Sequence, residues 1–225
     1  MPSTANTPKC FAQVGGRPLL EWIVDALAAN GVTRVCFVGG YLIEKVRASN
    51  PEFRFHHNAD WENNNILASL MCGEEEMDEP FVSCYSDTLF TAEAVARVLA
   101  SEADQSLLVD TAWLKRYKER TMHPPDDAEK VTVSNGLVTR VHRGIEPREA
   151  HGEFTGMAKF SAAGAAVLRA HYHSSEAGKN PSAYLIQLFQ EMIERGVKFA
   201  HADTAGGYME IDTQQDFELA RRDWR

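Results

Sequence analysis

Residues 81–109 read FVSCYSDTLFTAEAVARVLASEADQSLLV, and this stretch decides the fold class that the sequence predicts. The apolar run over 81–85 predicts a buried strand, 92–101 has the spacing of an amphipathic helix, and 106–109 predicts a second strand. Two strands joined through a helix are typical of a parallel α/β sheet. Asp87 follows the first strand, at the edge where such sheets bind ligands.

The alternation of strands and helices continues on both sides of this unit. The other predicted helices cover 18–30, 42–49, 66–77, 163–171, 183–195 and a final segment capped by Thr213. The other predicted strands cover 34–38, 53–57, 154–160, 197–200 and a hairpin over 130–141 with the turn Ser134-Asn135-Gly136. We therefore expect one α/β domain over residues 1–225, a Rossmann-like three-layer sandwich with a mixed, mostly parallel central sheet.

Length and composition limit the classes of function. The chain has 225 residues, 44% of them hydrophobic, and a formal charge of −9, which suits one substantial core. No Lys/Arg run stands out, so nucleic acid and anionic membranes are disfavoured as partners. No apolar run reaches membrane-spanning length and the N-terminus has no signal-peptide pattern, so we expect a cytoplasmic protein. Its cysteines (Cys10, Cys36, Cys72 and Cys84) are expected to be reduced and buried.

Carboxylates gather at two places in the sequence. Asp87 ends one strand, and Glu210 and Asp212 are two residues apart in an extended segment, so both point to one face. Carboxylates on one face repel unless a cation lies between them or both are solvated. Mg²⁺ prefers such oxygen ligands, so we expect a Mg²⁺ site held by these three residues. Two alternatives stay open: Asp87 caps a turn or helix, and the other two belong to a surface strand.

Lysine and histidine side chains give weaker signals. Lys9 precedes a core-entering segment and can reach phosphate oxygens as a point charge, although most such lysines are solvated. Neighbouring histidines occur at His56-His57 and at His171 and His173. Their side chains diverge on a strand and on a helix respectively, so we expect no zinc site there.

Seven motifs occur in an order that is typical of one superfamily: Pro8-Lys9-Cys10, Val14–Leu20, Tyr85-Ser86-Asp87, Asp126–Val131, Gly152–Gly156, Ala158–Ser161 and Glu210–Thr213. Together they resemble the sugar-nucleotidyltransferase-like superfamily. The strongest similarity is to its small cytidylyltransferase branch, the bacterial phosphocholine and 2-aminoethylphosphonate cytidylyltransferases. The resemblance covers nearly the whole chain and implies a fold of the nucleotide-diphospho-sugar transferase type.

The resemblance implies a Mg²⁺-dependent transfer. An oxygen of a substrate phosphate or phosphonate attacks the α-phosphorus of a nucleoside triphosphate, with CTP favoured, and pyrophosphate leaves without a protein nucleophile. Lys9 and Asp87 would be catalytic, and Asp87, Glu210 and Asp212 would carry the metal. Three residues would contact the nucleotide: Asn65, Ser69 and Ser86. The alternative for the first is that residues 63–65 cap the following helix.

The acceptor implied by the resemblance is a small phosphorylated amine or aminophosphonate, which calls for an anionic or aromatic pocket. Five residues are expected to contact it: Asp110, Trp113, Lys130, Glu153 and Tyr208. Core packing is the alternative for the two aromatic residues, and a solvated strand position for Lys130. A homodimer is left open.

The superfamily's first strand and its glycine-rich loop, which wraps the triphosphate with backbone N–H groups, have no counterpart before Met1. We expect the start to lie at an internal methionine, about two dozen residues into the full chain, with a truncated paralogue as the alternative. A missing central strand would leave its two neighbours unpaired. Two other functions stay open: a sugar-1-phosphate nucleotidyltransferase and a non-catalytic nucleotide-binding remnant.

Overall fold

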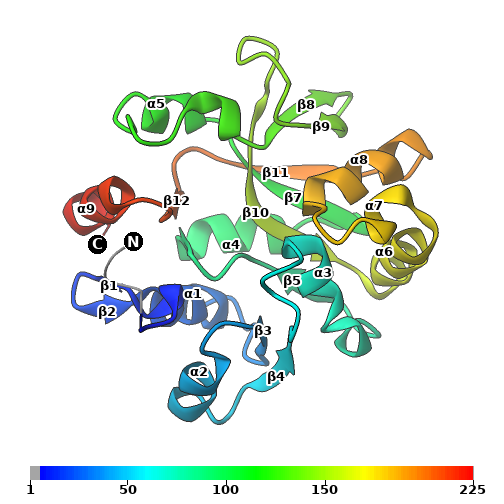
Figure 1. Cartoon of the computed structure of the whole chain (residues 1–225). Helices are drawn as coiled ribbons and strands as arrows, with labels where there is room; N and C mark the ends of the chain where they lie inside the picture. The colour runs from blue at the N-terminus through cyan, green and yellow to red at the C-terminus, as the bar shows by residue number, and fades with distance from the viewer. Residues whose placement is uncertain (1–5, 225) are drawn as a thin grey trace.

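A mixed sheet forms the centre of the protein in the computed structural model, which describes residues 6–224 (Figure 1). Its strands, in spatial order, are β5 (Phe81–Ser83), β10 (Gly152–Phe160), β7 (Gln105–Asp110), β11 (Ala200–Thr204), β9 (Leu137–Val141) and β8 (Lys130–Ser134). The pairings make β5, β7, β11 and β8 run in one direction and β10 and β9 in the other. The prediction of a mixed sheet with most strands in one direction is confirmed.

Strand β10 lies between β5 and β7, so the strands of the unit over 81–109 are not direct neighbours. Ala158 of β10 pairs with Ser83 on one side and with Leu107 on the other. Nearly every residue of β10 is buried, as expected for a strand with neighbours on both edges. The two strands of this unit run in the same direction, as predicted, and a strand from the second half of the chain separates them.

Helices cover both faces of the sheet, which confirms the three layers. Along β7, Leu107 and Val109 point to one face and Leu108 to the other. The helices α1 (Leu19–Ala28) and α4 (Ala92–Leu99) pack on the side of Leu108. The opposite face is covered by α3 (Ile66–Met71), α6 (Ala162–Ser174) and α8 (Leu185–Glu194).

Short elements surround this core (Figure 1). Three strand pairs lie outside the main sheet: β1 (Gln13–Val14) with β2 (Arg17–Pro18), β3 (Cys36–Gly39) with β4 (Arg54–His57), and β6 (Thr88–Phe90) with β12 (Tyr208–Glu210). The remaining helices are α2 (Ile43–Ser49), α5 (Trp113–Tyr117), α7 (Glu176–Lys179) and α9 (Gln214–Asp223), with 3-10 turns at Lys9–Phe11, Glu74–Glu76 and Pro125–Asp127. The sequence did not predict β6, α5 or α7.

Some boundaries and burial predictions are wrong. The helix expected over 66–77 ends at Met71, and Gly73 separates it from a 3-10 turn of three glutamates that has no buried face. The strand expected over 197–200 begins at Ala200, because the preceding residues form the turn out of α8. Cys36 and Cys72 are exposed thiols, since both lie at the rim of the fold.

A cavity of about 1010 Å³ separates the β3–β4 pair from the main sheet. Among residues 6–224, β3 pairs only with β4, and β5 only with β10. Apolar side chains of α1 and α3, including Leu20, Ile23 and Ile66, line the space between these two edges. Two strand edges therefore face one apolar space.

Within the described part of the chain, no helix is both long and apolar enough to cross a membrane.

Candidate active site

A lysine and two carboxylates meet beyond the carboxyl end of β5. The ammonium of Lys9 donates a hydrogen bond of 2.7 Å to Oδ2 of Asp87 and a second, shorter one to Oδ1 of Asp212. All three side chains remain partly accessible, with exposed fractions of 33%, 27% and 32%. Burial opposes the charge on Lys9, but the two carboxylates outweigh it and raise its pKa to about 12. The group is therefore a charged cluster that is open to a ligand.

Asp87 and Asp212 are brought together by backbone pairing. The amide of Ile211 donates to the carbonyl of Asp87 at 3.0 Å, and β12 pairs with β6 so that Glu210 lies opposite Thr88. Asp87, just before β6, and Asp212, just after β12, thus lie side by side although they are more than 120 positions apart. The structure brings together the residues that the sequence analysis assigned to a shared metal site; their roles stay predictions.

The N-terminus of α9 fixes the position of Asp212. The hydroxyl of Thr213 accepts a hydrogen bond from the amide of Asp216, whose carboxylate accepts from the amides of Asp212 and Thr213. This reciprocal arrangement is a capping box.

We expect Thr213→Ala to lower the free energy of unfolding by about 1 kcal/mol, because one of the cap hydrogen bonds is lost. Urea unfolding of the variant would measure this. Thr213→Ser keeps the hydroxyl, so it should retain most of the wild-type free energy of unfolding. If both substitutions destabilise the protein equally, the loss does not come from the hydrogen bond of the Thr213 hydroxyl.

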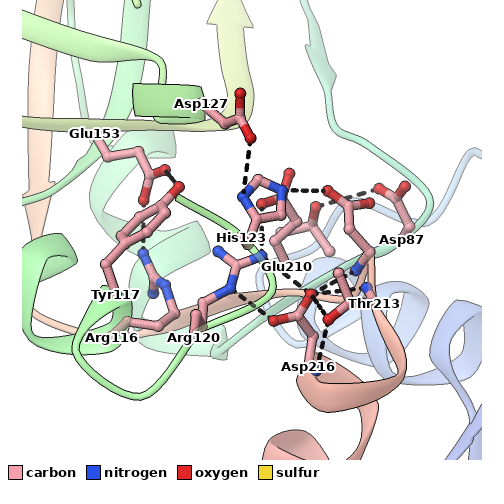
Figure 2. A network of polar contacts seen from close by, with 12 residues as sticks. Asp87, Arg116, Tyr117, Arg120, His123, Asp127, Glu153, Glu210, Thr213 and Asp216 are labelled. Atoms are coloured by element: carbon pink, nitrogen blue, oxygen red, sulfur yellow. Dashed lines mark hydrogen bonds and ion pairs between the residues drawn. The ribbon is translucent and has the colours of Figure 1, made fainter. Parts of the chain in front are cut away.

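Glu210 lies beside a buried arginine. Arg120 pairs with Asp216, with Nε–Oδ1 at 2.6 Å, and its Nη2 lies 3.3 Å from Oε2 of Glu210 (Figure 2). Burial and then the charge of Asp212 raise the pKa of Glu210 to about 8, although Arg120 opposes this shift. Asp212 behaves in the opposite way: burial opposes its ionisation, but the Lys9 ammonium outweighs it and lowers its pKa. Asp212 is thus more readily ionised than Glu210.

His123 extends the cluster. Its Nε2 lies 3.3 Å from Oδ2 of Asp212, and its Nδ1 lies 3.8 Å from Oδ2 of Asp127 (Figure 2). The sequence analysis did not identify this residue, because it follows the unpredicted helix α5 and has no local motif.

Among the residues predicted to contact the acceptor, Glu153 lines the cavity and Asp110 does not. The carboxylate of Glu153 accepts from Nη2 of Arg116 at 2.8 Å and from the hydroxyl of Tyr117 at 2.7 Å (Figure 2). Asp110 accepts from the amides of Ala112 and Gly206 and lies 3.0 Å from Arg116. Both carboxylates are therefore neutralised by partners within the fold.

The other predicted acceptor residues are mostly committed to packing. Lys130 is 1% exposed and donates to the carbonyls of Pro125 and Ala128, and Trp113 is buried; neither lines the cavity. Tyr208 lines the cavity, but the guanidinium of Arg116 covers its ring at 4.1 Å. Trp113 and Tyr208 therefore pack in the core, which was the alternative to acceptor binding. Contacts of these two residues and of Lys130 with an acceptor stay predictions.

The predicted nucleotide residues all line the cavity. Asn65 also accepts from the amide of Ile66 at 2.8 Å, so it caps α3 as the alternative proposed. The hydroxyl of Ser69 accepts from Nδ2 of Asn58 at 2.8 Å. Ser86 is adjacent to Asp87. These positions agree with a nucleotide in the cavity, and the contacts themselves stay predictions.

Arg143 and Glu129 form a further charged pair in the cavity wall that the sequence analysis missed. Nη2 of Arg143 lies 3.5 Å from Oε1 of Glu129, and its guanidinium stacks on Tyr184 at 4.1 Å. Its Nε has no hydrogen-bond partner among the described residues. Glu129 lies within the motif Asp126–Val131, where no role was predicted for it, and Arg143 follows the hairpin, where no motif marked it.

Burial raises the pKa of Glu129 from its ordinary value of 4.5 to about 7, although Arg143 lowers it. The folded state therefore binds this proton more tightly than the unfolded state, and the resulting stability is complete below about pH 4.5 and is lost as the pH rises through about 7. As the pH rises through this range, we expect the free energy of unfolding of the wild type to fall by at most about 3 kcal/mol relative to that of Glu129→Gln. Urea unfolding of both proteins from pH 4.5 to 8 measures it; pH profiles that stay parallel would contradict the shift.

The donor set fits a hard divalent cation. Asp87 and Asp212 offer oxygen ligands on one side of Lys9, and Glu210 and His123 lie next to them. Carboxylate oxygens with room for phosphate and water are what Mg²⁺ prefers. Two carboxylates that now share one ammonium can turn to a cation when Lys9 binds a phosphate.

An α/β sheet with acidic side chains and a lysine beyond its carboxyl edge is suited to a nucleoside triphosphate and its cation. The chain is a nucleotidyltransferase, a class that its similarity to known proteins supports. It belongs to the MobA-like NTP transferase family, whose domain matches residues 3–154.

The similar proteins agree with this class. A CTP:phosphoglutamine cytidylyltransferase of Campylobacter jejuni is 22% identical over 97% of this chain and 93% of its own length. A choline-phosphate cytidylyltransferase of Streptococcus pneumoniae is 30% identical over 40% of each chain. The solved structure of an inositol-1-phosphate CTP transferase from T. maritima matches with a TM-score of 0.75 and 22% identity, covering 96% of this chain and 87% of that one, and so supports the fold.

Proposed function

We propose that the protein is a Mg²⁺- and CTP-dependent cytidylyltransferase that transfers CMP to a small phosphorylated or phosphonate acceptor carrying an amine, with release of pyrophosphate. The observation that carries this proposal is the contact of Lys9 with Asp87 and Asp212 at the mouth of the cavity. The relatives' names support CTP as the nucleotide. We also propose that the protein acts in the cytoplasm.

The chain's own residues would bind and orient the reactants. Lys9 would leave its two carboxylates and donate to phosphate oxygens, adding positive charge where negative charge develops. Asp87 and Asp212, with Glu210, would hold Mg²⁺. When bound, the ion would neutralise phosphate charge and assist departure of pyrophosphate. No protein nucleophile is needed for in-line attack by the acceptor oxygen.

Cationic groups in the cavity wall favour a phosphorylated acceptor. Arg143 has an N–H without a partner among the described residues, and arginine suits phosphate and phosphonate groups. Glu129 lies beside it, so an acceptor with both an anionic and an ammonium group matches this pair of charges. This supports an acceptor that carries both an amino group and a phosphate or phosphonate, and disfavours the phosphate of an uncharged sugar.

Pyrophosphate release measures the proposed activity. CTP, UTP and GTP are each combined with phosphocholine, 2-aminoethylphosphonate, phosphoglutamine and glucose 1-phosphate in the presence of Mg²⁺. We expect CTP with an amino-containing acceptor to give a kcat/KM at least about tenfold above every other pair, or about 1.4 kcal/mol in transition-state binding. A preference for UTP or GTP with glucose 1-phosphate would instead support a sugar nucleotidyltransferase.

A further inference from the structure

Two histidines and an aspartate form a cluster outside the candidate active site. Nε2 of His151 lies 2.8 Å from Oδ2 of Asp203, and Nδ1 of His201 lies 2.7 Å from Oδ1 of the same carboxylate. The imidazole rings meet edge to face, with centroids 4.9 Å apart. One ligand atom from each residue lies within 4.8 Å of the other two.

The fold builds this cluster from two distant segments. On β11, Ala202 packs toward α4, so His201 and Asp203 share the opposite face of the strand. β11 pairs with β9 only at Ala200, which leaves the following part of this edge open within the described residues.

Gly152, at the start of β10, allows His151 to lie close to the other two residues of the cluster. A Cβ added at Gly152 would lie 2.5 Å from Cγ1 of Val109 and 2.8 Å from the carbonyl oxygen of Asp110. Only glycine lets the chain approach β7 this closely. The amide of His151 donates to the carbonyl of Val131 at 2.8 Å, which anchors the residue where its side chain reaches Asp203.

We propose that His151, His201 and Asp203 bind one first-row transition-metal ion of the Zn²⁺ class. Two imidazole nitrogens, which are borderline donors, together with one hard carboxylate oxygen suit zinc, cobalt and nickel and suit Mg²⁺ poorly. Three protein ligands leave one position of a tetrahedral site for water. The site is separate from the proposed Mg²⁺ site and does not depend on the proposed function.

The spacing of the donors agrees with such an ion. Zn–N distances of about 2.0–2.1 Å in a tetrahedral site put neighbouring donor atoms about 3.3 Å apart. The two hydrogen bonds at 2.7 and 2.8 Å would lengthen by about 0.5 Å when a metal replaces the shared protons. Small rotations of these side chains, of which His151 is exposed and the other two are partly exposed, can supply that change without moving the strands.

The charges around the cluster also favour a cation. Among residues 6–224, Asp203 forms ion pairs only with histidines, so no lysine or arginine competes for it. A second group of similar composition, Cys36, His56 and Glu76, differs in this respect. Arg54 holds Glu76 at 2.6 Å. Partial desolvation and then the charge of Glu76 raise the pKa of the Cys36 thiol to about 11, so its thiolate is scarce.

A metal ion bound by His151, His201 and Asp203 would hold β10 and β11 together close to the candidate active site. His151 precedes Glu153 by two residues, and β11 ends at Thr204, which pairs with Asp110. The ion would therefore fix the start of β10 against the end of β11, beside Asp110 and Glu153, which pair with Arg116.

Cobalt binding tests the proposal without any activity assay. Protein stripped with a chelator is titrated with Co²⁺ in several millimolar Mg²⁺, which keeps carboxylate-only sites filled, and visible d–d absorption is recorded. We expect one equivalent to bind, and Zn²⁺ to displace it and raise the unfolding midpoint. His151→Gln and His201→Gln should each weaken binding at least about tenfold, the effect typical of losing a ligand-sphere group. His171→Gln, which changes a histidine on α6 that contacts a backbone carbonyl, should bind as the wild type does.

Two outcomes would overturn the proposal. If no saturable binding occurs, the cluster is an ion pair only. If Cys36→Ser abolishes the signal while His151→Gln leaves it unchanged, the metal lies in the other group. Because neither readout uses CTP, failure here leaves the proposed transferase activity untouched, and failure of that activity leaves this proposal untouched.

Discussion

Replacing Asp87 with asparagine is expected to lower kcat for pyrophosphate release about a thousandfold, or about 4 kcal/mol of transition-state stabilisation. Asparagine keeps the shape of the side chain and removes the charge that pairs with Lys9 at 2.7 Å and would hold Mg²⁺. Removing one preorganised electrostatic contact typically costs this much in phosphoryl and acyl transfer. The measurement is a steady-state assay at saturating CTP, with unfolding curves to confirm that the variant is folded.

A matched control is available on α1. Asp25 is exposed and pairs with Arg17 on the surface, so Asp25→Asn removes the same charge far from the cluster. We expect its activity to stay within a factor of two of the wild type, as surface pairs contribute little. If Asp87→Asn retained comparable activity, Asp87 would have no part in the reaction.

Filling the cavity between β3 and β5 with an apolar strand is expected to raise the free energy of unfolding by a few kcal/mol. We propose that one such strand belongs to the active protein. It would hydrogen-bond to both open edges and bury aliphatic side chains against α1 and α3, each contributing about 1.5–3 kcal/mol before the entropy of ordering is subtracted. Its carboxyl end would emerge near Asp87, where the following loop could reach the triphosphate through backbone N–H groups.

The comparison is between the chain translated from Met1 and the chain translated from an in-frame start further upstream, with an upstream Gly/Ser extension of equal length as the control. Hydrogen exchange should show new protection at the amides of β3 and β5, and kcat/KM should rise, only with the natural extension. A stop codon just upstream of Met1, or edges that are already protected without an extension, would contradict the proposal.

Local patterns in the sequence were enough to predict most of the fold. Amphipathic spacing located α1, α4 and α8 within a few residues, and the Asn-Gly turn located the β8–β9 hairpin. The place of β10 could not be predicted in the same way. Its pairing with both β5 and β7 depends on contacts between residues about forty to eighty positions apart, which no local signal encodes.

The candidate active site likewise contains residues that local sequence patterns identified and residues that depend on contacts between distant segments. Asp87 follows the end of β5, where ligands bind in such sheets, and its grouping with Glu210 and Asp212 was proposed from their chemistry and from the resemblance. The antiparallel pairing of β6 with β12, which brings the three residues together, has no local signal in the sequence.

Arg116, on the unpredicted helix α5, neutralises Asp110 and Glu153, which were predicted to contact the acceptor. Arg120, just after that helix, contacts Glu210, which was predicted to bind the metal. Whether a carboxylate is free or already paired depends on the partners that folding brings to it, and the sequence alone does not give those partners.

The central claim is that Asp87 and Asp212 hold the catalytic cation once Lys9 turns to a phosphate. The most direct measurement is the anomalous scattering of Mn²⁺ in crystals of the catalytically active protein grown with CTP. We expect a manganese peak within coordination distance of carboxylate oxygens of both Asp87 and Asp212, with Lys9 in contact with a phosphate oxygen. A structure in which CTP is bound, Lys9 still bridges the two carboxylates and manganese lies elsewhere would contradict the account.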